Sequence, residues 1–390
     1  MQSPKTDMEY RKLGNTGLTV SAIAFGPQMY MFGATVPPET EELTYKTLKR
    51  AMELGVNYID VAEFYGAGLL ETYIGNALKK MGTHRENFVI STKIYFGPAN
   101  GVNSVGCSRK RLIGGLKESL KRLQLDYVDI VFASRYDYET DLEEVCRAMD
   151  HLVQTEKASY WGTSEWSAQQ IKKAIELCEQ LNLEKPVCEQ SQYNMLHRER
   201  FEGDYAELFE KYKFGSTIWS PLAAGLLTGK YLDDPNAGRL DNDRMKAFYN
   251  WDKWFGPEKI NRTRAMFNEF IKIAKSLGGT MPQLALAWVL KNKDVSTIIC
   301  AFTKLEQVEE NLKAVQLTKK ITPEIEAIID QWLENSPKTE FDWRAHTQRP
   351  ARRIRGVVKV SIVEKKSFWA TVFGCIPQRR KNQVYSTPAK

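Results

Sequence analysis

Eight short apolar runs alternate with amphipathic stretches over the first 335 residues, and this rhythm constrains the fold more than any other feature. Runs this apolar are typical of strands buried on both faces, as in a parallel sheet. The stretches between them repeat apolar residues at helical spacing. The predicted strands lie at 20–25, 58–61, 88–94, 127–133, 158–163, 187–190, 216–219 and 295–300. The predicted helices lie at 39–54, 69–80, 108–123, 141–155, 167–181, 202–213, 260–277, 281–292, 304–315 and 322–334.

This order of elements predicts an α/β protein, namely a (β/α)8 TIM barrel occupying residues 1–339. Gly14-Asn15-Thr16-Gly17 predicts a β-hairpin over residues 10–20, ahead of the barrel. A doubly wound Rossmann sheet is the alternative. It requires G-x-G-x-x-G after the first strand, which residues 26–29 do not supply. Residues 225–230 imitate a phosphate-binding loop but are one residue short and lack the following Ser or Thr.

The composition argues against metal sites and export. The six cysteines form no CxxC pair, and the four histidines form no metal-binding pattern, so we expect no metal. No apolar run reaches the ~18 residues of a membrane-spanning helix. The N-terminus has no apolar core of a signal peptide, and isolated thiols fit a reducing compartment. We therefore expect a cytoplasmic protein.

Residues 340–390 form a separate basic extension, which we expect to be flexible. They hold 12 Lys and Arg against 3 Asp and Glu, an excess larger than the +7 of the whole chain. The charge of the barrel therefore gives no reason to expect a nucleic-acid partner. Basic residues interleaved with Phe368, Trp369 and Cys375 also suit the cytoplasmic face of a membrane. Packing of the tail on the barrel and, more weakly, RNA binding are the other interpretations.

Catalytic residues of such a barrel lie at the carboxyl ends of its strands. Asp60 ends the second predicted strand and Lys93 the third, and a buried lysine needs a partner such as Asp60. Tyr65 follows on the loop above. A nearby cation is expected to lower the tyrosine pKa from ~10, so that the hydroxyl can protonate a carbonyl oxygen while a hydride reaches its carbon. A structural Asp–Lys pair beside a loop tyrosine is an equally simple interpretation.

Residues 60–66, Asp-Val-Ala-Glu-Phe-Tyr-Gly, resemble the signature of the aldo-keto reductase superfamily. Within it the chain is most similar to the β subunits of voltage-gated potassium channels, over about residues 9–335. The supporting segments are 91–94, 123–129, 132–135, 160–164, 188–190 and 219–223.

The resemblance implies an NADPH-dependent reductase that transfers hydride to a small aldehyde or ketone. Tyr65 would be the general acid, tuned by Lys93 and Asp60, with Ser134 helping to orient the carbonyl. The second function that it implies is an auxiliary subunit of a voltage-gated potassium channel, which would use bound NADPH as a redox sensor. Such subunits form homotetramers on the channel α subunits.

The resemblance also implies how the residues of this chain would hold NADPH or NADP⁺. Ser164 and Gln190 would bind the carboxamide, and Trp219 would stack under the nicotinamide ring; Asp60 and Ser134 would border it. The pyrophosphate would be held by Ser220, Pro221, Leu222, Ala223, Ala224 and Lys230. The adenosine and its 2′-phosphate would be held by Arg239, Thr303, Gln307, Glu310 and Asn311. Asn311 has a simpler interpretation, satisfaction of helix backbone.

Three departures from the family pattern bear on activity. Ser134 stands where most of the superfamily has His and the channel subunits have Asn, and its hydroxyl reaches less far. Proton-transfer help is worth ~10²–10⁴ in rate, so we expect slow turnover. Glu165 replaces an Arg of the channel subunits and should weaken cofactor binding unless it points away. Pro27-Gln28 replaces a Thr-Trp pair, which predicts a different substrate pocket.

Overall fold

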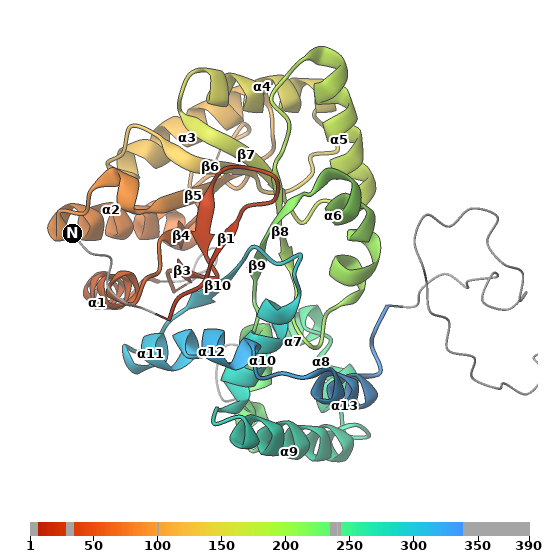
Figure 1. Cartoon of the computed structure of the whole chain (residues 1–390). Helices are drawn as coiled ribbons and strands as arrows, with labels where there is room; N and C mark the ends of the chain where they lie inside the picture. Colours follow the sequence, from red (N-terminus) through yellow and green to blue (C-terminus); the bar gives the residue numbers. More distant parts are fainter. Residues whose placement is uncertain (1–6, 29–34, 100, 235–239, 241–242, 338–390) are drawn as a thin grey trace, which may run out of the picture. The chain divides into compact units, whose positions relative to one another are not determined.

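The computed structural model describes residues 7–28, 35–99, 101–234, 240 and 243–337. Its eight parallel strands close into a barrel in chain order, with the last strand paired to the first (Figure 1). Together with the helices around it, this is the (β/α)8 TIM barrel that the sequence predicts. The barrel strands are β3 (Ile23–Gly26), β4 (Tyr58–Asp60), β5 (Val89–Ile94), β6 (Val128–Ala133), β7 (Ala158–Ser164), β8 (Cys188–Gln192), β9 (Gly215–Trp219) and β10 (Thr297–Ala301).

The predicted hairpin is present as β1 (Tyr10–Lys12) and β2 (Thr19–Ser21), which pair antiparallel. The first predicted strand, 20–25, is wrong in one respect, because its first residues belong to β2 and the barrel strand begins at Ile23. At the hairpin turn Gly14 has a φ of 57°, and a Cβ there would lie 2.4 Å from the backbone nitrogen of Gly215. The turn therefore needs glycine to approach the barrel so closely.

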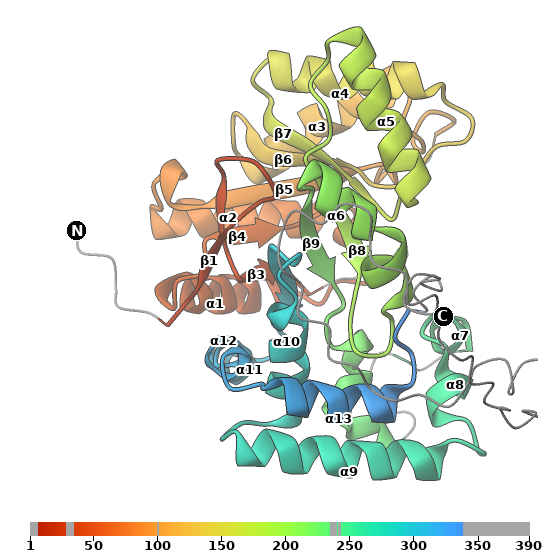
Figure 2. The ribbon, with the colours of Figure 1, turned by 45° about the vertical axis from the view of Figure 1, so that its right-hand side comes forward.

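The helices surround the barrel, and α9 and α13 lie side by side outside it in both views (Figures 1 and 2). Two predicted N-caps are confirmed: Ser108 Oγ accepts from Arg111 N, and Ser167 forms a capping box with Gln170. The long helices are α1 (Thr40–Glu53), α2 (Leu69–Met81), α3 (Arg109–Leu123), α4 (Leu142–Gln154), α5 (Ala168–Leu181), α9 (Ile260–Ser276), α10 (Met281–Lys291) and α13 (Pro323–Leu333).

Shorter helices replace some predicted elements. The helix expected at 202–213 is a π-helical turn, η3 (Glu199–Asp204), followed by α6 (Ala206–Tyr212). The helix expected at 304–315 is split into α11 (Glu306–Leu312) and α12 (Ala314–Thr318). The described parts of the stretch expected to be irregular after β9 contain η4 (Ala223–Thr228), η5 (Lys230–Leu232), α7 (Asp243–Phe248) and α8 (Trp251–Phe255). Two further short turns are η1 (Tyr65–Gly68) and η2 (Arg85–Asn87).

Two apolar clusters divide the core. The larger one fills the space between the strands and the helices. The smaller one, the barrel-floor cluster, combines side chains of the hairpin with side chains of the barrel strands, several of which are the first residues of their strands. Its fully buried members include Leu13, Tyr58, Phe132 and Cys188. Because the floor is filled with apolar side chains, polar chemistry is left to the opposite end, the mouth of the barrel.

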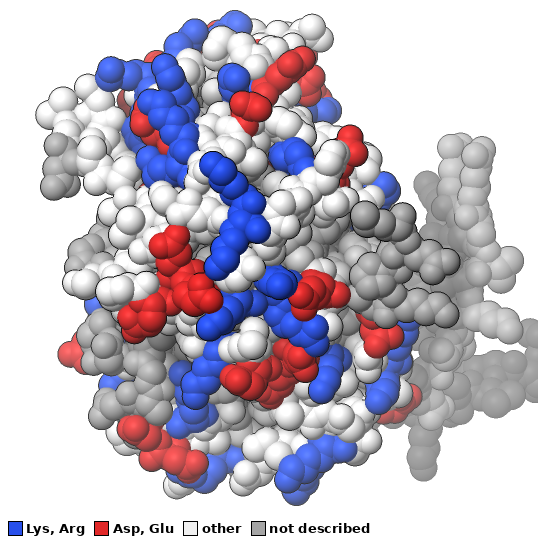
Figure 3. All heavy atoms as spheres, turned by 90° about the vertical axis from the view of Figure 1, so that its left-hand side faces the viewer, with Lys and Arg blue, Asp and Glu red and all other residues white. Residues whose placement is uncertain are grey.

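The charges on one face of the molecule are mixed. Figure 3 faces the side on which α1 and α2 lie in Figure 1, and it shows basic and acidic side chains interspersed among the described residues. The ion pairs of this region agree, since Arg50 of α1 meets Glu309 of α11, and Lys80 of α2 meets Glu42 of α1. The described part of this face therefore offers no continuous basic surface.

Within the described ranges, no helix has the length and apolar character needed to cross a bilayer. The extension at 340–390 lies outside the described residues, so its boundary and its membrane contact stay predictions.

Candidate active site

The centre of the barrel mouth is an ion pair between Asp60 and Lys93. Asp60 ends β4, and Lys93 lies near the end of the neighbouring strand β5. Lys93 Nζ lies 2.6 Å from Asp60 Oδ2 and donates a second bond, of 2.8 Å, to the carbonyl oxygen of Val61. Both side chains are almost fully buried, at 2% and 3% exposure. The ion pair that the strand ends predict is thus present, and a charge of each sign offsets the cost of burying the other.

The second oxygen of Asp60 is held from two sides. Ser91 Oγ donates to Asp60 Oδ1 at 2.7 Å, and Gln190 Nε2 donates to the same atom at 2.8 Å. Gln190 Nε2 also donates to Thr217 Oγ1, which fixes the plane of the amide. Ser91 is a site residue that the sequence analysis missed. It lies two residues before Lys93 on the same strand, and this spacing places both side chains on one face.

Tyr65 stands beside the ion pair, half-buried, at the start of η1. Lys93 Nζ lies 5.1 Å from the centre of the tyrosine ring, and Phe64 packs edge-on at 4.6 Å. Burial raises the Tyr65 pKa above its ordinary value of 10.0, and the Lys93 charge, which lowers it, only partly offsets this. The predicted lowering of the Tyr65 pKa is therefore wrong. The hydroxyl stays protonated at neutral pH, as a proton donor must.

Ser134 directly follows β6, and Ser164 is the last residue of β7. Ser134 Oγ is buried and has no hydrogen-bond partner among the described residues, whereas Ser164 Oγ donates to the carbonyl oxygen of Gln190 at 3.0 Å. Arg135, not predicted as a site residue, donates to Ser134 O at 2.5 Å and contacts Ser164 Oγ at 3.4 Å. A buried hydroxyl without a partner is costly. This donor and acceptor set fits a carboxamide, the polar group of a nicotinamide.

Glu165, the predicted obstacle to cofactor binding, is neutralised by a partner. Its carboxylate pairs with Arg200 of η3 and accepts from Trp219 Nε1 at 2.8 Å. Burial lowers the pKa of Arg200, but the surrounding acidic groups, Glu165 first, raise it above its ordinary value. Glu165 adopts a left-handed φ of 60°, which costs about 1–2 kcal/mol for a non-glycine residue. Arg200 was not predicted, because it is 35 residues away in sequence.

The turn after β9 is tightly wound. Four of its residues have positive φ, namely Ser220, Ala223, Ala224 and Gly225. Its amide groups bond within the turn: Ala223 N donates to Ser220 O at 2.9 Å, and Ala224 N to Ser220 Oγ at 3.0 Å. Pro221 has no N–H, and Leu222 accepts from Gly225 N. The backbone donors of Ala223 and Ala224 are therefore used within the turn. Lys230, predicted to help hold the pyrophosphate, begins η5 after this turn, and its Nζ lies 4.9 Å from the centre of the Tyr231 ring.

The residues predicted on the adenosine side fall into two groups. Thr303 donates from N and Oγ1 to Gln307 Oε1, at 2.8 and 3.1 Å. Glu310 Oε1 accepts from Thr280 Oγ1 before α10, and Asn311 is buried within α11. Arg239 lies outside the described residues, as does the loop at 29–34 after Pro27-Gln28. The structure thus brings Thr303 and Gln307 together and turns Glu310 toward another helix.

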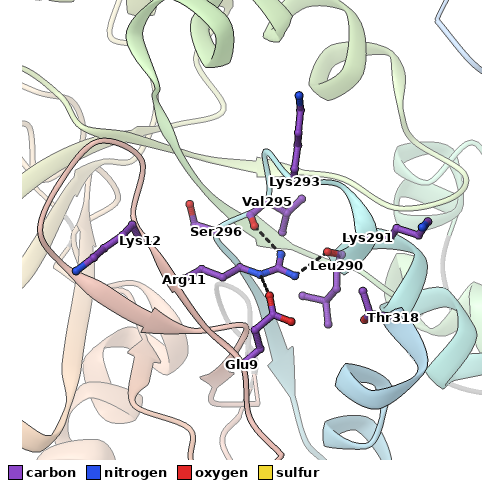
Figure 4. A pocket seen from close by; sticks show the side chains of 9 residues that line it. All are labelled: Glu9, Arg11, Lys12, Leu290, Lys291, Lys293, Val295, Ser296 and Thr318. Atoms are coloured by element: carbon purple, nitrogen blue, oxygen red, sulfur yellow. Dashed lines mark hydrogen bonds and ion pairs between the residues drawn. The ribbon is translucent and has the colours of Figure 1, made fainter. Parts of the chain in front are cut away.

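A hollow of about 590 Å³ lies at the other end of the barrel, between the hairpin and the start of β10 (Figure 4). Arg11 lies in the middle of the residues that line it. The guanidinium pairs with Glu9 at 2.9 Å and donates at 2.8 Å to the carbonyl oxygens of Leu290 and Val295. Arg11 thereby donates to carbonyl oxygens at the end of α10 and in the turn that follows it. These bonds join the hairpin to the barrel, so we interpret the hollow as structural.

The described residues include no group of three or more His, Cys, Asp or Glu side chains arranged to hold a metal ion. The family model for the aldo/keto reductase family matches residues 23–330. The matched range begins with β3 and reaches into α13, and it includes all eight barrel strands and every mouth residue described above.

Proposed function

Because the chain belongs to the aldo/keto reductase family, whose members are oxidoreductases that use nicotinamide cofactors, we propose that it reduces aldehydes or ketones with NADPH. The observation that carries this proposal is the buried Asp60–Lys93 pair with Tyr65 beside it at the barrel mouth. A proton donor next to a fixed cation suits the protonation of a carbonyl oxygen. The bound nicotinamide would supply the hydride to the carbonyl carbon.

The residues of the chain would divide the remaining work. Tyr65 donates its proton to the carbonyl oxygen, and Lys93 stabilises the phenolate left behind. Asp60 holds Lys93 charged, since burial lowers the Lys93 pKa but Asp60 and Tyr65 raise it above the ordinary 10.5. Ser134, Ser164 and Gln190 border the position of the carboxamide, and Trp219 offers its ring. Lys230, Thr303 and Gln307 hold the phosphates and adenosine.

We expect turnover to be slow. The Ser134 hydroxyl stands in place of a longer side chain, and the raised Tyr65 pKa makes the phenol a weaker acid. Both effects should slow proton transfer without preventing cofactor binding. The shorter side chain of Ser134 could lower the rate by up to ~10²–10⁴.

The same features favour a second role, as an auxiliary subunit of a voltage-gated potassium channel that senses redox state through bound NADPH. A site that binds cofactor and reacts slowly suits such a sensor. This role requires a homotetramer, so sedimentation velocity of the full chain tests it. A tetramer that co-purifies with a channel α subunit would support the role, and a monomer would contradict it.

The reductase is tested by titrating the purified chain with NADPH and NADH, and then following NADPH absorbance after addition of 4-nitrobenzaldehyde in a single turnover. We expect tighter binding of NADPH and oxidation that slows by ~10²–10⁴ in Tyr65→Phe, with unchanged cofactor affinity. Tyr138→Phe, which removes a hydroxyl from an 85% exposed ring, is the control. It should leave both the NADPH affinity and the oxidation rate unchanged. Oxidation that persists in Tyr65→Phe would remove Tyr65 from the acid role.

A further inference from the structure

The ring of Trp219 is held by a hydrogen bond at its edge and by another aromatic ring stacked on it. It ends β9, and its indole Nε1–H donates to Glu165 Oε1 at 2.8 Å. Phe248 of α7 stacks on the ring, with centroids 6.1 Å apart and planes 27° apart. An indole has one donor and no acceptor, so the bond to Glu165 sets the rotation of the ring about its side-chain bonds.

The Glu165 carboxylate is in turn fixed on both oxygens. Oε1 also accepts from the backbone N–H of Gln192 at 2.8 Å, and Gln192 is the register partner of Trp219 on the neighbouring strand. Oε2 pairs with Arg200. One side chain therefore connects the ends of β7, β8 and β9 to η3. Charge-assisted bonds of this kind are stronger than neutral ones.

We propose that Glu165, held by Arg200, is a positioning residue that sets the plane of Trp219 for the nicotinamide ring. This inference rests on the proposed function, in which Trp219 meets that ring. It reverses the expectation that an acid at this position opposes the cofactor, because Arg200 cancels the charge and the carboxylate acts on Trp219. Glu165 makes these contacts with a left-handed backbone, at a φ of 60°.

The test compares two variants of equal charge, Glu165→Gln and Glu165→Leu. Both leave Arg200 without its carboxylate, so any attraction of Arg200 for the cofactor phosphates is the same in both. Glu165→Gln keeps an oxygen that can accept from Trp219 Nε1, whereas Glu165→Leu does not. Glu143→Ala, which breaks the exposed pair with Arg147 on α4, serves as a distant control.

The first readout needs no cofactor. In ¹⁵N–¹H spectra of the full chain, Trp219→Phe identifies the Trp219 indole resonance. We expect that resonance to shift, and its exchange with solvent to accelerate, in Glu165→Leu but not in Glu165→Gln. The indole of Trp161, which donates to Glu184 O at 2.8 Å, is an internal reference that should not move in either variant. A Trp219 resonance that is unchanged in Glu165→Leu would overturn the proposal.

The second readout is NADPH affinity by calorimetry, with steady-state reduction of 4-nitrobenzaldehyde. We expect Glu165→Leu to bind NADPH about tenfold more weakly than Glu165→Gln, the loss of about one neutral hydrogen bond, with kcat changed less than about threefold. Equal affinities in the two variants would overturn the positioning role alone. A wild-type chain that binds no NADPH would overturn the proposed function and the positioning role with it, while the indole resonance would still report the Glu165 contact.

Discussion

Each end of the barrel holds a cation, which is partly buried at the floor, where Arg11 is 17% exposed, and almost fully buried at the mouth, where Lys93 is 3% exposed. At the floor, the guanidinium of Arg11 bonds to Glu9 and to two main-chain carbonyls, so all its partners are structural. At the mouth, Lys93 bonds to Asp60 and Val61 but also faces Tyr65. The mouth further contains Ser134 Oγ, a buried atom without a partner among the described residues. At the floor, the polar groups around Arg11 bond to one another and stabilise the fold. At the mouth, Tyr65 and Ser134 are placed to meet a ligand.

The strongest way to break this contrast is Asp60→Asn. It leaves Lys93 buried without a carboxylate, and we expect the free energy of unfolding to fall by about 3–5 kcal/mol, with loss of reduction. Urea unfolding followed by circular dichroism measures the change. The added substitution Lys93→Met should restore most of the stability but none of the activity. A stable Asp60→Asn protein with normal reduction would contradict the role of the pair.

Arg11→Leu should have a smaller effect, confined to stability. It removes the donors of two carbonyls and one carboxylate, and we expect a loss of about 1–3 kcal/mol. The rate of 4-nitrobenzaldehyde reduction should stay unchanged, because Arg11 lies at the floor. Arg11→Lys keeps the charge but lacks the planar fork, so it should recover only part of the stability. A fall in rate without a fall in stability would show that the two ends are coupled.

The smallest expected effect is that of pH on the mouth. The folded-state pKa values of Tyr65 and Lys93 both lie above their ordinary values of 10.0 and 10.5. Groups with raised pKa values contribute fully to folding stability below their unfolded-state pKa, and this contribution is lost as pH rises through the folded-state pKa. Below about pH 10, Tyr65 therefore keeps its proton and Lys93 keeps its charge. The single-turnover rate should therefore not fall between pH 7 and about 10. A fall centred below pH 9 would mean that the acid is a different group.

Sequence alone predicts the parts of the site that follow from strand order. Asp60 and Lys93 end neighbouring strands, so their contact follows from the barrel itself, and all eight strands lie within a few residues of their predicted positions. The first strand begins late because β2 takes the residues up to Ser21 for the hairpin. An apolar run along the chain does not show which partner a strand pairs with.

Properties that depend on surroundings were not predictable. The direction of the Tyr65 pKa shift depends on burial by Phe64 and its neighbours, which strand-end reasoning does not contain. Glu165 is an acid beside the expected position of a phosphate-bearing cofactor, but Arg200 pairs with it. Arg200 lies on the π-helical turn η3, which overlaps only the start of the helix predicted at 202–213. Likewise, the internal bonds of the turn at Ser220 arise from four positive φ angles that its sequence, with a single glycine among them, does not announce.

The bond from Arg11 to the carbonyl oxygen of Val295 joins residues 284 positions apart, and β3 pairs with β10 in the same region. During synthesis at about 5–20 residues per second, the hairpin and β3 leave the ribosome roughly 15–60 s before their partners exist. Until then the edge of β3 is an unpaired template for association with other chains. The nascent chain is thus most open to such association at β3, and pairing with β10 ends that exposure.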